Sequence, residues 1–150
     1  MEHDFKTFPE LTNSQMETEY FAFPHKQIME DFRAKVVKVH DGDSVTLRWD
    51  ERDFDFPVRF INIAAPELDQ IGGDDSQKFL ELLLLNEEVD ILINPQNRVD
   101  KWGRLLGNVM FRGLDAGETS MFCGHSIPWS QVGEQTPIPD FEKEMAKIWA

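Results

Sequence analysis

The sequence predicts a protein of the α+β class that is mainly β. Apolar and polar residues alternate in five short segments, as they do along half-buried strands. One segment with helical spacing of its apolar residues lies between the third and the fourth of these. This order of elements is that of an OB-fold-type barrel. We therefore predict a five-stranded OB-fold-type β-barrel with two to three flanking helices, formed by one domain, since 150 residues suffice for one core but not comfortably for two.

Three closely spaced strands open the domain. Their apolar positions are Val37 and Val39, then Val45 and Leu47, and finally residues 58–63. The first two strands flank a predicted turn at residues 40–43, because Asp and Gly favour turns. A charged hairpin loop at residues 49–57 separates the second strand from the third.

The helix and the remaining strands follow in order. The helix is predicted to begin at an N-cap formed by Asp75 and Ser76 and to stop at Asn86, with Phe79, Leu82 and Leu83 at helical spacing. Strands are predicted at Val89–Ile93 and at Arg104–Phe111. A short helix is expected at residues 118–125, with Phe122 on its inner face, and a terminal helix at residues 141–149.

The predicted domain organisation has three parts: an acidic extension with scattered aromatic residues (1–33), the barrel domain (34–130), and a loop with the C-terminal helix (131–150). The extension has two interpretations. It is either a solvated tail or a segment whose aromatic residues dock on the domain or on a protein partner in an assembly; these residues are Phe5, Phe8, Tyr20, Phe21 and Phe23.

Composition limits the class of protein. No apolar run approaches the roughly 20 residues of a membrane-spanning helix, and the N-terminus lacks the basic start and apolar stretch of a secretion signal. The single cysteine, Cys123, excludes an internal disulfide. We expect a soluble protein in the cytoplasm or within a virus particle. The net charge of −13 predicts weak non-specific affinity for long polyanions, although residues 91–114 form a net basic stretch.

Three polar motifs indicate little when each is taken alone, but their combination is typical of a known family. They read Val-Lys-Val-His-Asp-Gly-Asp-Ser-Val at 37–45, Val-Arg-Phe-Ile-Asn-Ile-Ala-Ala-Pro-Glu at 58–67, and Asp-Lys-Trp-Gly-Arg-Leu-Leu at 100–106. Alone, the first and the third are typical of simple turns. In this order they resemble the staphylococcal-nuclease (thermonuclease) family, whose members share a turn Asp-Gly-Asp-Thr, a strand Arg…Asp-Ala/Thr-Pro-Glu and a hairpin Asp-Lys-Tyr-Gly-Arg. The resemblance extends from about Val36 to Trp129.

The resemblance implies a nuclease that hydrolyses phosphodiester bonds of DNA or RNA by metal-assisted attack of water. The implied catalytic residues are Arg59, Glu67 and Arg104. Glu67 is the implied general base, or the group that orients the water. The two arginines are implied to clamp phosphate oxygens bidentately, which the planar guanidinium suits better than lysine.

Metal and substrate residues are also implied by the resemblance. The Asp43 carboxylate and the backbone carbonyl of Ala65 match ligands of a Ca²⁺ ion, a hard cation that prefers oxygen, and Asp41 lies near enough to support the ion. Lys101 and Trp102 are implied to lie beside the substrate and to offer it a charge and a stacking face.

One position departs from the family pattern. Ala64 stands where the family has an aspartate that binds the metal directly. Loss of even a supporting residue commonly lowers metal affinity or activity by about 10- to 100-fold. Three interpretations therefore stay open: an active nuclease with altered metal dependence, a weak or inactive nuclease-like module that binds nucleic acid or protein, and a structural component of a virus particle or another assembly.

Overall fold

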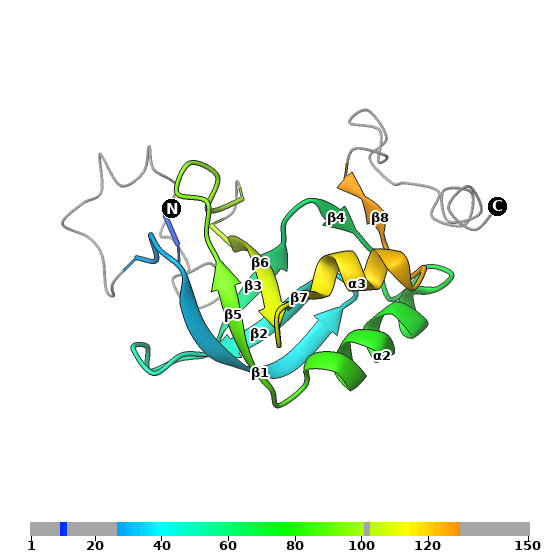
Figure 1. The fold of residues 1–150 in the computed structure, drawn as a ribbon, viewed down its shortest axis with the longest axis horizontal. Helices are drawn as coiled ribbons and strands as arrows, with labels where there is room; N and C mark the ends of the chain where they lie inside the picture. The colour runs from blue at the N-terminus through cyan, green and yellow to red at the C-terminus, as the bar shows by residue number, and fades with distance from the viewer. Residues whose placement is uncertain (1–9, 12–26, 101–102, 130–150) are drawn as a thin grey trace.

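The structure is a computed structural model, and it describes residues 10–11, 27–100 and 103–129. Five strands form a closed barrel: β1 (Phe32–Asp41), β2 (Ser44–Arg48), β3 (Phe56–Phe60), β5 (Glu88–Leu92) and β6 (Leu105–Phe111). They follow the order β3-β2-β1-β5-β6, and a parallel pairing of β3 with β6 closes the ring. The predicted five-stranded barrel of an α+β protein is thus confirmed (Figure 1).

Short strands and two helices complete the described part of the chain. β7 (Leu114–Asp115) extends the sheet beyond β6, and β4 (Ile63–Ala64) pairs with β8 (Ile127–Pro128) outside the barrel. Helices α2 (Gly73–Leu84) and α3 (Ala116–Phe122) lie beside each other at one end of the barrel (Figure 1). The terminal helix predicted at 141–149 lies outside the described residues.

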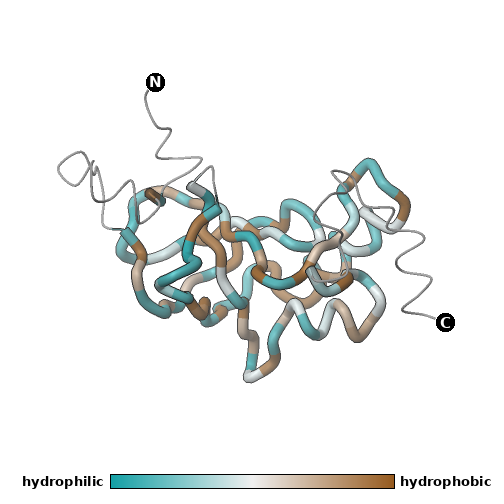
Figure 2. The backbone as a smooth tube through the Cα atoms, turned by 90° about the horizontal axis from the view of Figure 1, so that it is seen from above, coloured by the Kyte–Doolittle hydropathy of each residue, from teal (hydrophilic) through white to brown (hydrophobic). Residues whose placement is uncertain are grey.

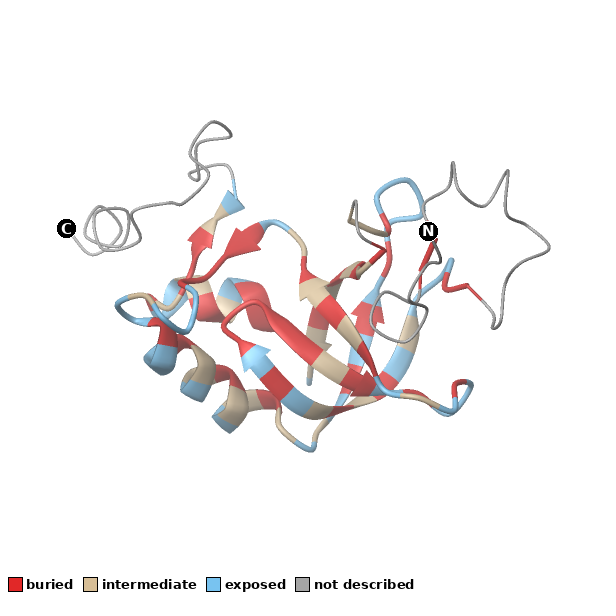
Figure 3. Cartoon of the chain, turned by 180° about the vertical axis from the view of Figure 1, so that it is seen from behind, coloured by how far each residue is buried: buried red, intermediate tan, exposed pale blue. Residues whose placement is uncertain are grey.

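Alternation along the strands builds the core. In β3, Phe56, Val58 and Phe60 are buried, whereas the residues between them are partly exposed. Hydrophobic and hydrophilic residues are interspersed along the backbone in Figure 2, and buried residues recur along the strands of the barrel in Figure 3. The prediction for β1 needs one correction. A bulge between Val36 and Lys38 shifts the register, so Val36 faces the core in place of Val37.

The structure also corrects the predicted helix ends. α2 begins at Gly73, after Gly72 in the left-handed conformation, and not at Asp75 and Ser76, which lie inside the helix. α3 begins earlier than predicted because the Asp115 side chain accepts a hydrogen bond from the Glu118 backbone N–H (3.0 Å). The prediction that Phe122 faces inward is wrong. Small residues form the buried face of α3, and Phe122, its last residue, is 94% exposed.

Part of the N-terminal extension packs on this same chain. Glu10 and Leu11 are fully buried, and Ile28 belongs to the barrel core. The aromatic residues of the extension lie outside the described residues, so the idea that they dock stays a prediction. Among the described residues, no helix is both long and apolar enough to cross a membrane.

Candidate active site

The turn between β1 and β2 holds two buried aspartates close together. Asp41 Oδ1 accepts hydrogen bonds from the Asp43 backbone N–H (3.1 Å) and from the Ser44 hydroxyl (2.8 Å). A side chain at Gly42 would collide with Ser76 and Ala65, since a Cβ atom there would lie 1.8 Å from Ser76 Oγ. Glycine therefore lets the turn approach α2 and Ala65, the residue that follows β4. The turn interpretation and the site interpretation of this motif are compatible.

Asp43 connects this turn to the other two motifs. Its Oδ2 accepts a hydrogen bond from the Ala65 backbone N–H (3.1 Å) and lies 3.4 Å from Arg59 Nη2. Burial, with the neighbouring carboxylate of Asp41, raises the pKa of Asp43 to about 7, although Arg59 acts in the opposite direction. Two adjacent carboxylates in a buried turn thus carry more negative charge than the single guanidinium beside them offsets.

Glu67 lies on the loop between β4 and α2, close to these groups. The pKa of its carboxyl is raised, first by burial and then by Asp41, while His40 and Arg59 lower it. The loop is held by Gln70, whose side chain accepts from the Glu67 N–H (2.8 Å). It also lies against α2, because a Cβ atom on Gly73 would lie 1.9 Å from the Glu67 carbonyl oxygen.

Arg59 and Arg104 line one hollow of about 310 Å³. Arg59 comes from β3, and its Nη1 donates to the Phe60 carbonyl (3.0 Å). Arg104 directly precedes β6, and Asp100 fixes it by accepting from both the Arg104 backbone N–H and its Nε, each at 2.9 Å. The other residues of the hollow are Ile61, Asn62, Asn97, Leu106 and Trp129.

Some residues of this hollow were missed in the sequence. Trp129 lies over Arg59, with 5.2 Å between the guanidinium carbon and the ring centre, and its backbone N–H donates to the Asn62 carbonyl (2.8 Å). Asn62 adopts a left-handed conformation (φ 70°), which asparagine tolerates better than most residues. The sequence predicts Asp100 only as part of a hairpin. Its spacing of four residues from Arg104 could have indicated that the two residues pair.

The structure thus places the predicted residues in two adjoining groups. Asp41, Asp43 and Glu67 form an acidic group near Arg59, and Arg59 also lines the hollow together with Arg104. Ala65 joins the acidic group through its backbone N–H. Lys101 and Trp102 lie outside the described residues.

The oxygen groups around Asp43 suit a hard cation by type but not by number. Calcium takes about six to eight oxygen ligands. Asp43 and Asp41 supply carboxylates and Ala65 a carbonyl, whereas Ala64, 3% exposed and paired with Ile127, supplies no side-chain oxygen. Within the described ranges, no three acidic, histidine or cysteine side chains converge as a metal-binding group. The oxygen donors of these residues are therefore of the type that Ca²⁺ prefers, but they are fewer than the ion takes.

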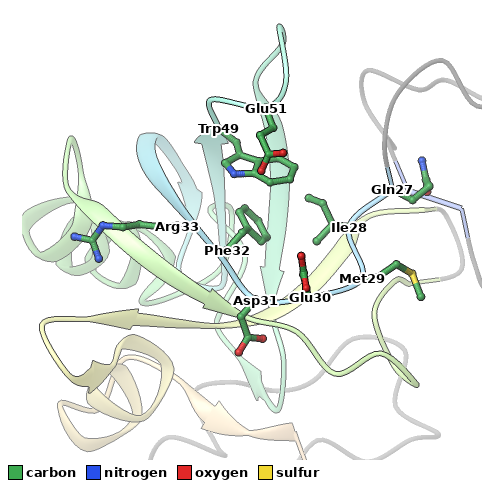
Figure 4. A pocket seen from close by; sticks show the side chains of 9 residues that line it. All are labelled: Gln27, Ile28, Met29, Glu30, Asp31, Phe32, Arg33, Trp49 and Glu51. Carbon is green, nitrogen blue, oxygen red and sulfur yellow. The ribbon is translucent and has the colours of Figure 1, made fainter.

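A second hollow, of about 300 Å³, contains none of the predicted site residues. It is lined by residues 27–33 together with Trp49 and Glu51. Figure 4 shows the Trp49 and Phe32 rings on one side of it and Ile28 opposite; the two rings lie 4.8 Å apart. Neither Arg59 nor Arg104 lines this second hollow.

Comparison with known proteins supports the sequence motifs. A micrococcal nuclease of Shigella flexneri is 34% identical over 79 residues, which are 53% of this chain and 42% of the relative. Uncharacterized endonucleases of Escherichia coli O157:H7 and of Escherichia coli are each 26% identical over 125 residues, 83% of this chain and 78% of each relative. The chain thus resembles a micrococcal nuclease and two endonucleases at modest identity. A comparison with models of protein families found no match.

The likeness has a defined reach. The match spans less than half of the Shigella nuclease. It shows that this chain is similar to a part of that nuclease. The barrel and the resemblance to nucleases are therefore shown, whereas the roles of single residues are proposals.

Proposed function

We propose that the chain hydrolyses phosphodiester bonds of DNA or RNA by attack of water, as an endonuclease. The observation that carries this proposal is the position of Arg59, which lies beside the acidic group of Asp41, Asp43 and Glu67 and also lines the hollow that it shares with Arg104. A phosphodiester in the hollow would meet two guanidiniums, with a carboxylate close by to act on water.

The arginines bind and neutralise the phosphate in this proposal. Planar guanidiniums form paired hydrogen bonds to phosphate oxygens, and fixed donors stabilise the charge that develops in a five-coordinate transition state. Asp43 and Asp100 hold Arg59 and Arg104, respectively, so that the donors need little rearrangement when the substrate arrives. Lys101 and Trp102 are proposed to contact the flanking nucleotide.

Glu67 is the proposed general base. Its raised pKa brings the carboxyl nearer to the pH at which the protein works, and a base is most effective when its pKa lies near that pH. Glu67 takes a proton from the attacking water, while Arg59 keeps the phosphate oriented.

We propose that Asp43, the Ala65 carbonyl and Asp41 hold Ca²⁺. When bound, the ion would supply positive charge to the phosphate and bring a coordinated water to the site. Because Ala64 provides no carboxylate, we expect weak affinity and a need for high metal concentrations.

A second candidate is a nucleic-acid-binding module that does not cut. The buried, oxygen-free side chain of Ala64 favours it, since binding needs the arginine hollow but not the metal. An assembly role through residues 1–33 is compatible with either candidate.

A cleavage assay decides between the candidates. Labelled single-stranded DNA and RNA are incubated with Ca²⁺, Mg²⁺, Mn²⁺ or a chelator, using the wild type, Glu67→Gln, Ala64→Asp and the control Glu118→Gln on α3. We expect the wild type and the control to cut, and Glu67→Gln to lose about 100- to 10,000-fold in rate. If the wild type is inert with every metal while Ala64→Asp cuts, the second candidate holds and the lost ligand explains it.

A further inference from the structure

The buried side chain of Glu10 forms ion pairs with two arginines. Its carboxylate pairs with Arg52 through Oε1 and with Arg98 through Oε2, and the side chains of all three are at most 1% exposed. Oε2 also accepts the Ile28 backbone N–H (3.0 Å). Arg52 comes from the loop between β2 and β3 and Arg98 from the loop between β5 and β6, so a single carboxylate joins both loops.

Neighbouring bonds fasten the same segment. Arg98 donates through Nε to the Ile28 carbonyl (2.7 Å) and through Nη1 to the Leu11 carbonyl (2.5 Å). The Leu11 N–H donates to the Gln27 side chain (2.6 Å). We call Glu10 and Leu11 the N-terminal clamp. In Figure 1 this short stretch lies beside the loop between β5 and β6, and Figure 4 shows Ile28, one of its partners, opposite the Phe32 and Trp49 rings.

The N-terminal clamp also contacts the chain segment that precedes Arg104. The Glu10 backbone N–H donates to the Gly103 carbonyl (3.1 Å), and Gly103 directly precedes Arg104. From the other end, the Arg98 carbonyl accepts the Leu106 N–H (2.9 Å). Glu10 therefore contacts the arginine-bearing segment at both ends, once through its side chain and once through its backbone.

This segment forms one wall of the hollow. Asn97, Asp100 and Arg104 face the hollow from it, while Arg59 and Trp129 face it from elsewhere. Arg98, which pairs with Glu10, directly follows Asn97 in the chain. The charge of Glu10 also affects the protonation of Arg98. Burial lowers the pKa of Arg98 and Arg52 lowers it further, whereas Glu10 raises it. Without the carboxylate, the buried guanidinium of Arg98 on this wall and that of Arg52 would repel each other.

We propose that Glu10 is a positioning residue: it holds the wall formed by Arg98–Asp100 and Gly103–Arg104 against the barrel, so that Arg104 shares the hollow with Arg59. The inference rests on the proposed function, because it gives Glu10 a role in placing the two arginines that are proposed to bind the phosphate. Glu10 itself does not touch the hollow. Its side chain is fully buried and acts through Arg98 and Gly103.

Native-state hydrogen exchange on the wild type tests the inference without any need for activity. If the clamp holds the wall, the amides of Glu10 and Arg104 exchange through one opening event, with equal rates and equal denaturant dependence. Amides buried in β1 serve as the reference for global unfolding. A Glu10 amide that exchanges at least about tenfold faster than the Arg104 amide would overturn the proposal, because the clamp would then open while the wall stays in place.

Glu10→Gln tests the role of the carboxylate, with Asp55→Asn as the control. Asp55 also accepts a hydrogen bond from an arginine Nε, that of Arg48, and this pair lies on the exposed surface. In Glu10→Gln we expect the Arg104 Nε–H to exchange about tenfold faster, as after the loss of a charge-assisted hydrogen bond, while the Arg48 Nε–H is unchanged. Asp55→Asn should do the reverse. An unchanged Arg104 signal in a folded Glu10→Gln protein would overturn the proposal.

Kinetics separate positioning from general stability. Glu10→Gln should lower kcat by up to about 100-fold, the effect of misplacing a catalytic group by about an ångström, with a smaller change in KM. Leu80→Ala removes buried contacts in α2, away from this wall, and should leave kcat unchanged at temperatures where circular dichroism shows it folded. If Glu10→Gln does not fold, the wild-type exchange result decides. If the wild type cuts nothing, the proposed function fails, but both exchange experiments still decide the role of Glu10.

Discussion

The guanidinium of Arg59 lies between the ring of Trp129 and the carboxylate of Asp43. The guanidinium carbon is 5.2 Å from the ring centre, and Nη2 is 3.4 Å from Asp43 Oδ2. Contact with the aromatic face and with the carboxylate limits the orientations open to the guanidinium. Trp129 itself is 50% exposed, so its ring has free area at the edge of the hollow that both arginines line.

Trp129→Ala should weaken the binding of single-stranded nucleic acid. Stacking of one base on an aromatic ring contributes about 1–3 kcal/mol, so we expect the Kd to rise at least about fivefold. Fluorescence anisotropy with a labelled oligonucleotide measures this in the Glu67→Gln background, which removes cleavage. Phe122→Ala is the matched control, because Phe122 is an exposed aromatic residue that does not line the hollow. Equal effects of the two substitutions would refute a stacking role for Trp129.

Gly73→Ala should displace the loop that carries Glu67. Alanine in a helix is favoured over glycine by about 1 kcal/mol, but a Cβ atom here would lie 1.9 Å from the Glu67 carbonyl oxygen. A backbone atom cannot rotate away as a flexible side chain can, so the collision outweighs the helix preference. We expect a loss of about 1–3 kcal/mol in the free energy of unfolding, measured by urea denaturation, and a lower kcat.

Gly113→Ala serves as the comparison for that experiment. Gly113 has a φ of 82°, and a Cβ atom on it would meet nothing within 4 Å. Its replacement should cost about 1–2 kcal/mol from backbone strain alone and should leave kcat unchanged. If both alanines reduce kcat to the same extent, the loss reflects stability and not the position of Glu67.

The sequence predicted the barrel well because its strands alternate clearly and its motifs occur in order. It failed where local signals competed. Asp75 and Ser76 are good N-cap residues, yet the helix begins earlier at Gly73, because only glycine allows the close contact with the Glu67 loop. The sequence does not reveal the bulge between Val36 and Lys38 either, since one inserted residue changes which side chains face the core without changing the composition.

The site was predictable in its motif residues but not in what holds them. Asp43, Arg59, Glu67 and Arg104 were found in the sequence as a set. The contacts of Glu10 with Arg52 and Arg98 join residues 42 and 88 positions apart, and no local pattern indicates such a pair. Trp129 reaches Arg59 only because β8 pairs with β4. Each of these strands has only two residues, which is too short for an alternation of apolar and polar residues to be recognised in the sequence.

Asp43→Asn should stabilise the protein when a chelator removes metal ions, and the gain should depend on pH. The pKa of Asp43 rises from its ordinary value of 3.8 to about 7 in the folded chain, because burial and then Asp41 disfavour its charge. Folding thus favours the protonated form, so stability from this group is complete below the unfolded pKa and is lost as the pH rises through about 7. Asparagine, which stays neutral, avoids this loss.

The advantage of Asp43→Asn should therefore be large near pH 8 and absent near pH 4, as measured by thermal unfolding in chelator. Asp55→Asn is the control, since that exposed aspartate lies outside the acidic group. Excess Ca²⁺ should raise the stability of the wild type near pH 8 and not that of Asp43→Asn, because an ion that binds only the folded state stabilises it. A gain of equal size at both pH values would refute the prediction, because it would show that folding does not raise the pKa of Asp43. A loss near pH 8 would show that Arg59 outweighs burial and Asp41 at this carboxylate.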